Sequence, residues 1–78
     1  MIGQTVMIIC YRDGQWVDYC PALVFSSQTT TIESTPATVI TATGVRPDGA
    51  TFARSGLLPA RSVSLPRDGS FAWRSLTE

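Results

Sequence analysis

The segment RPDGATFARSG, residues 46–56, decides the fold, because it specifies both a turn and the pairing of two strands. Proline at position 47 presets the first turn dihedral, and glycine at position 49 allows a positive φ where the turn ends. This chemistry predicts a hairpin whose loop is Pro47, Asp48 and Gly49, in a type I turn followed by a one-residue bulge.

The loop also sets the register of the two strands that it joins. The expected pairs are Arg46 with Ala50, Val45 with Thr51, Gly44 with Phe52, Thr43 with Ala53, and Ala42 with Arg54. Burying a phenylalanine contributes roughly 2–3 kcal/mol, against ~0.5 kcal/mol for an exposed arginine contact. We therefore expect Phe52 to lie over Gly44 and face the core, with Arg46 and Arg54 at the strand ends. A binding hot spot built on the same residues is the alternative.

Short strands and turns account for the rest of the chain. Helical periodicity is absent, strand-forming residues dominate, and the turn marker Asp-Gly occurs at positions 13, 48 and 68. The segment 12–20 is expected to be a long hairpin arm or a structured loop, 27–36 a short edge strand or an exposed loop, and 56–65 irregular. The expected strands are Gln4–Tyr11, Pro21–Ser26, Thr38–Val45, Ala50–Arg54 and Ser70–Ser75.

Length and composition predict one small folded domain, residues 1–78. A chain of 78 residues with 44% apolar side chains folds, but it buries only ~60% of its surface. The apolar run 6–9 is too short for a signal peptide or a membrane span, so a cytoplasmic protein with no membrane partner is expected. The predicted core comprises Val6, Ile8, Leu23, Val24, Val39, Ile40, Phe52, Phe71 and Trp73.

The charges are balanced overall and unevenly distributed. Six arginines oppose four aspartates and two glutamates, and five of the arginines lie in residues 46–78. Nucleic-acid-binding domains usually carry a basic excess, so nucleic acid is disfavoured as a partner. A mildly acidic half and a mildly basic half suit self-association, while scattered surface charge is the simpler interpretation.

The residues needed for common catalytic and metal sites are missing. The chain has no histidine and no lysine, which removes the usual general base and the commonest metal ligand. Two cysteines without histidine cannot hold a four-coordinate zinc ion, and no phosphate-binding glycine loop is present. We therefore expect a protein that is not an enzyme and that uses neither a cofactor nor a metal.

Cys10 and Cys20 can be arranged in two ways. A two-residue hairpin at Asp13-Gly14 places Cys10 opposite Val17, which leaves Cys20 too far along the strand for a disulfide. A wider loop over residues 11–19 would let the two thiols meet at its base. A cytoplasmic setting favours free thiols, buried as small apolar side chains.

Tyr11, Trp16 and Tyr19 bracket the first turn. If exposed, they form an aromatic cleft able to hold a peptide, a base or a neighbouring subunit. In the alternative arrangement they cap an open end of a barrel. Trp16 is the first choice for a contact residue, because a tryptophan beside a polar turn is hard to bury in so small a core.

A strand ending in YRDG, the apolar strand PALVF, the RPDG hairpin and the closing strand GSFAWRS together resemble a small SH3-like β-barrel. More narrowly, the chain resembles short proteins of phages and prophages from GC-rich bacteria. This resemblance spans roughly residues 4–75 and implies a binding or assembly role. The expected fold is thus all-β, a small SH3-like barrel of about five short antiparallel strands.

These observations favour a protein-binding or assembly module encoded by a phage or mobile element, present in the host cytoplasm or the virion. Its partner would be another protein or further copies of the chain, and the Thr-rich segment 28–35 could add strands between subunits. An inhibitor or adaptor of a host protein is the alternative, and a weak nucleic-acid binder using the C-terminal arginines is a further one. The candidate contact residues are Trp16, Tyr11, Tyr19, Arg46, Arg54 and Arg61.

Overall fold

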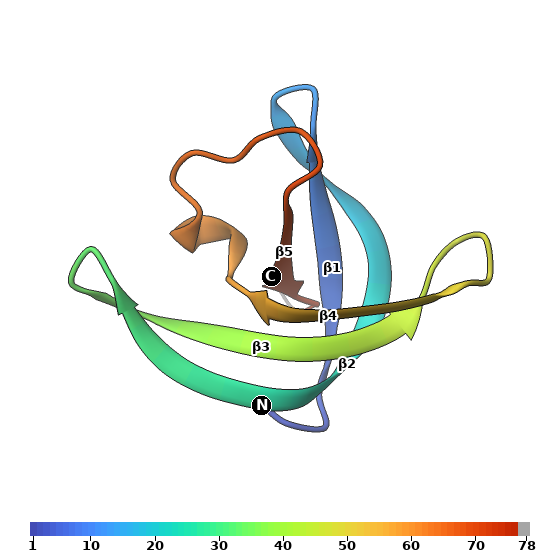
Figure 1. The fold of residues 1–78 in the computed structure, drawn as a ribbon, viewed down its shortest axis with the longest axis horizontal. Helices are drawn as coiled ribbons and strands as arrows, with labels where there is room; N and C mark the ends of the chain where they lie inside the picture. Colours follow the sequence, from blue (N-terminus) through green and yellow to red (C-terminus); the bar gives the residue numbers. More distant parts are fainter. Residues whose placement is uncertain (77–78) are drawn as a thin grey trace.

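A computed structural model describes residues 1–76 and shows five antiparallel strands in a single strongly curved sheet (Figure 1). The strand order across the sheet is β4-β3-β2-β1-β5, and one turn of 3-10 helix, η1, lies between β4 and β5. No α-helix occurs within residues 1–76. The elements are β1 (Thr5–Arg12), β2 (Gln15–Ile32), β3 (Thr35–Val45), β4 (Thr51–Leu57), η1 (Ala60–Ser62) and β5 (Phe71–Ser75).

The two outer strands of the sheet approach each other and make it barrel-like. The Trp73 N–H of β5 donates to the Leu58 carbonyl just after β4 at 3.1 Å, and Pro59 forms a parallel bridge with Trp73. The curvature lets one face of a single sheet enclose a core. The prediction of a small all-β fold of five antiparallel strands that curl into a barrel-like sheet is therefore confirmed.

The β3–β4 hairpin has the turn and register that the RPDG segment predicts. The Gly49 N–H donates to the Arg46 carbonyl at 2.8 Å, and Gly49 has a φ of 87°. The Asp48 carboxylate accepts a hydrogen bond from the Ala50 N–H at 3.0 Å, which tightens the loop. The strand pairs run from Val45 with Thr51 to Ala42 with Arg54, as expected.

The β1–β2 hairpin turns on two residues, so β2 begins at Gln15 and the expected start at Pro21 is wrong. Asp13 and Gly14 both have positive φ, 51° and 81°, the combination that matches the twist of a two-residue hairpin. Cys10 consequently lies opposite Val17. Cys10 and Cys20 are both buried and free, which confirms the prediction of unpaired thiols.

Two bulges divide β2 and give it its curvature. Ile8 pairs with Cys20 and Ile9 with Asp18, so Tyr19 is an extra residue in the strand. Val24 pairs with Ala42 and Ser26 with Thr41, so Phe25 is a second one. A bulge bends the strand that carries it and increases the local twist, which suits a sheet that must curl.

The segment 27–36 is strand rather than loop. Pairing of β2 with β3 continues to Ile32 with Thr35, and Glu33 and Ser34, with φ of 48° and 67°, make the turn. The third strand thus begins at Thr35 instead of Thr38. This two-stranded arm, residues 26–41, extends to one side of the barrel in Figure 1.

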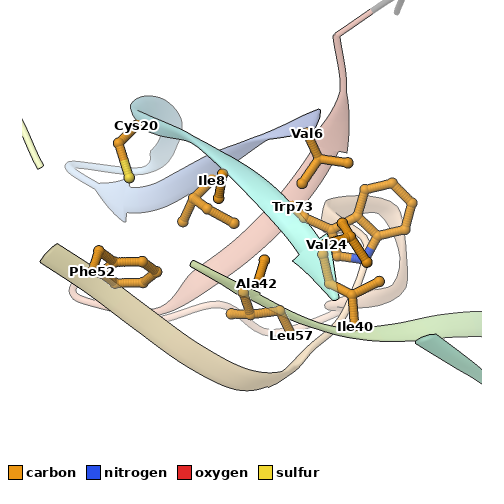
Figure 2. Packing of buried hydrophobic residues seen from close by; sticks show 10 residues of the cluster. Val6, Ile8, Cys20, Val24, Ile40, Ala42, Phe52, Leu57 and Trp73 are labelled. Atoms are coloured by element: carbon orange, nitrogen blue, oxygen red, sulfur yellow. The ribbon is translucent and has the colours of Figure 1, made fainter. Parts of the chain in front are cut away.

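The core lies on the concave face of the sheet, with the ring of Phe52 toward one end and the indole of Trp73 toward the other (Figure 2). Six predicted core residues are in it, and Phe71 packs against it. Leu23 is not, because successive strand residues face opposite ways and Val24 takes the inner position. Val39 is only half-buried. The cluster comprises Val6, Ile8, Cys20, Ala22, Val24, Ile40, Ala42, Phe52, Leu57 and Trp73.

Candidate binding surface

Tyr11 and Trp16 form a cross-strand pair at the end of the β1–β2 hairpin. Their rings meet edge to face with centroids 5.1 Å apart, and both side chains are half-buried. They alternate with Cys10 and Val17, whose side chains lie toward the concave face, so the two rings lie on the outer face of the sheet. This packing holds Trp16 in place while leaving part of it in solvent.

Tyr19 lies with a different set of rings, at one end of the barrel. Its ring centroid is 5.4 Å from that of Phe52 and 5.1 Å from that of Phe71, and Phe52 and Phe71 are 5.2 Å apart. The Arg54 guanidinium carbon lies 5.1 Å from the Phe71 ring centroid, a cation–π distance. Tyr19 thus helps to cap the core, and it does not share a cleft with Tyr11 and Trp16.

Arg46 lies beside the thiol of Cys20, at the same end of the barrel. Its Nε atom is 3.5 Å from the Asp48 carboxylate, an ion pair at the hairpin turn. Burial raises the pKa of the Cys20 thiol, and the positive charge of Arg46 opposes this shift more weakly. A buried thiol with a raised pKa is chemically inert, so Cys20 acts as a core side chain.

Arg61 lies on the exposed surface of η1, next to the end of the β2–β3 arm. It lines a shallow hollow of ≈220 Å³ together with Glu33 and Pro36 of the arm, Ser62 of η1, and Ser64 beyond η1. The structure therefore brings Arg46, Arg54 and Tyr19 to one end of the barrel and places Arg61 elsewhere.

Three of the six arginines contact an acidic side chain or an aromatic ring. Arg74 holds the Asp18 carboxylate through two hydrogen bonds of 2.9 and 3.1 Å, and Arg46 pairs with Asp48. The Arg54 guanidinium makes a cation–π contact with the Phe71 ring. A backbone-tracking nucleic-acid site needs several cations along one groove, and these three arginines are each engaged by another side chain.

The outer face of β2, β3 and β4 carries an apolar surface that the sequence interpretation missed. Leu23, Phe25 and Val45 are 49%, 53% and 61% exposed. We call this surface the outer patch, and by strand alternation it also includes polar and small residues, none of them charged. It is formed by Pro21, Leu23, Phe25, Thr41, Thr43, Val45, Thr51 and Ala53.

The register shows that the outer patch is continuous. Leu23 lies directly opposite Thr43, and Val45 is the diagonal neighbour two residues further along β3. The Thr43 hydroxyl donates to the Phe52 carbonyl at 3.0 Å, so its polar atom is already engaged with β4. The strand PALVF contains the signal for this surface, because Pro21, Leu23 and Phe25 alternate with the buried Ala22 and Val24.

No group of three or more histidine, cysteine or acidic side chains among residues 1–76 is arranged to hold a metal ion. No helix in that part of the chain is long and apolar enough to span a membrane. In comparisons with known proteins, no family model, no curated protein and no solved structure matched the chain.

Proposed function

We propose that this protein is a non-enzymatic protein-binding or assembly module whose contact surface is the outer patch. The observation that supports it is the exposure of Leu23, Phe25 and Val45 together in a part of the outer sheet face that carries no charged residue. In an antiparallel sheet with one face on the core, the other face is usually polar, and contiguous apolar residues on it mark interaction sites.

The composition of the outer patch favours a protein surface as its ligand. Covering the exposed halves of Leu23 and Phe25 contributes about 1–2 kcal/mol each, enough for recognition when a few such contacts cluster. The Asp18–Arg74 ion pair joins β2 to β5 across β1 and provides a polar border next to Met7. An apolar centre with a polar rim is the usual anatomy of a protein interface.

The setting that we propose is a phage or mobile element, with the protein in the host cytoplasm or the virion. It rests on the resemblance of YRDG, PALVF, RPDG and GSFAWRS to short phage and prophage proteins. Within that setting a virion or accessory component is the first candidate. An inhibitor or adaptor of a host protein is the second, because the same surface serves either role.

A capture experiment with matched variants tests the proposed function. The tagged chain is used to capture proteins from an extract of a GC-rich bacterium, in parallel with the double variant Leu23→Thr/Phe25→Thr. The control is Leu65→Thr, which removes a more exposed leucine (88%) that lies outside the outer patch. We expect one partner to be retained by the wild type and the control and lost with the double variant.

If the double variant retained the partner as well as the wild type does, the outer patch would not be the contact surface. Light-scattering mass measurement of the purified chain distinguishes an assembly module, which forms oligomers, from an adaptor that binds only a different protein.

A further inference from the structure

Beyond Val24, the β2 strand has an open edge on the side away from β3. The last backbone hydrogen bonds on that side are those between Gly3, Gln4 and Val24, at 2.8 and 2.9 Å. The pairing of β1 with β2 ends at Thr5 with Leu23. Within the described part of the chain, no strand continues the sheet there, so residues 25–32 of β2 form a strand edge.

The hydrogen bond of Trp73 identifies which backbone groups face this edge. The Trp73 indole N–H donates to the Thr38 carbonyl at 3.1 Å, so that carbonyl points away from β2. Thr38 is paired with Thr29, which makes this a pair without mutual backbone hydrogen bonds. The N–H and C=O of Thr29 therefore point to the open edge, and those of Ser27 and Thr31 do so by the two-residue period.

The two edges of the arm differ in their protection. On the β3 side, the outward positions are Pro36, which has no N–H, and Thr38, whose carbonyl is already bonded. On the β2 side, Ser27, Thr29 and Thr31 keep both backbone groups available. Natural edge strands are blocked by proline, charge or a cover, and this β2 edge has none of them.

We propose that this edge binds the same edge of a second copy of the chain, antiparallel, with Thr29 opposite Thr29 and Ser27 opposite Thr31. Each of these residues exchanges its N–H and C=O with its partner, and Thr–Thr and Ser–Thr pairs are favourable neighbours across strands. The two Glu33 carboxylates lie at opposite ends of this pairing, whereas a parallel arrangement would place them side by side.

The differing edges also predict that the assembly stops at two copies. A two-fold pairing uses the β2 edge of both chains at once and leaves only the guarded β3 edges outside. The contact is small, so a dissociation constant of about 1–100 µM is expected. It deepens the proposed assembly role by naming the partner, but it uses backbone groups of the arm rather than the outer patch.

Charge-swap variants at Thr29 test this pairing by sedimentation velocity. Wild-type protein should change from monomer to dimer as its concentration rises to about 200 µM. Thr29→Lys and Thr29→Glu should each weaken the dimer about tenfold, because like charges then lie directly opposite each other. Mixing the two variants should restore the dimer. The control is Thr30→Lys, whose new charge faces Gln28 of the other copy and should leave the dimer intact.

Thr29→Pro provides a second, independent variant. It removes an N–H that points to solvent in the monomer, so the fold should persist while the dimer is lost. A wild type that stays monomeric, Thr29 variants that still dimerise, or a mixture that fails to restore the dimer would each overturn the proposal. Loss of the dimer with unchanged partner capture would leave the proposed function of the outer patch standing.

Discussion

Gly44 shows how one residue sets the spacing of two strands. A Cβ atom at this position would clash with the Pro21 carbonyl oxygen and would lie 3.2 Å from the Cβ of Ala22. The sequence predicts that Gly44 lies opposite Phe52, and the structure confirms that pair. The close contact with β2 could not be predicted, because it depends on a register between strands distant in sequence.

Gly44→Ala is therefore expected to destabilise the fold by about 1–3 kcal/mol, as β2 and β3 must separate to admit a methyl group. Urea denaturation of the variant and of Thr51→Ala, an exposed change in the same hairpin, measures the difference. A free energy of unfolding equal to that of the wild type would contradict the close packing of these strands.

Cys20 makes the free energy of unfolding depend on pH in the alkaline range. Burial raises the pKa of its thiol above the ordinary 9.0, so the folded chain holds this proton more tightly than the unfolded chain. The stabilising contribution is complete below the unfolded pKa and is lost as the pH rises through the folded pKa. The free energy of unfolding should fall above about pH 9 more steeply for the wild type than for Cys20→Ala. If the free energy of unfolding of the wild type and of Cys20→Ala changed with pH in parallel, the Cys20 thiol would not be shielded from solvent in the folded chain.

At the scale of elements, β2 carries most of what the sequence could not predict. Asp-Gly and Pro-Asp-Gly mark their hairpins, since those turns need particular residues. The bulges at Tyr19 and Phe25 have no comparable marker, because any residue can be the extra one in a strand. The placement of Leu23 in the core was a separate error, since Leu23 and Val24 are successive strand residues that face opposite sides of the sheet.

Truncation of two neighbouring residues of β2 should have very unequal effects on the free energy of unfolding. Val24→Ala removes a fully buried side chain and is expected to lower the free energy of unfolding by about 2 kcal/mol. Leu23→Ala should change it by less than about 0.5 kcal/mol, because half of that side chain is already in water. Thermal or urea unfolding of both variants makes the comparison. Similar losses for the two would mean that the faces of β2 are misassigned.

At the scale of the whole molecule, closure of the sheet separates the concave face, which encloses the core, from the outer face, which carries the outer patch. Trp73 connects distant parts, since its backbone N–H bonds to Leu58 and its indole N–H to Thr38. The sequence predicted a small all-β barrel, and it offered the capping of an open end by Tyr19 as one of two arrangements. It also indicated an edge strand in the Thr-rich segment 28–35, but it missed the outer patch, which is defined by what the other strands leave uncovered.

The bulge at Phe25 determines which residues of β2 face the open edge, and α-proton contacts measured by nuclear magnetic resonance test it most directly. Pairs without mutual backbone hydrogen bonds bring Cα atoms to about 4.5 Å, close enough for a strong nuclear Overhauser effect. We expect such contacts between Val24 and Ala42 and between Thr29 and Thr38. A contact of Gln28 with Thr38 instead would contradict the bulge and, with it, the outward position of Thr29 on the open edge.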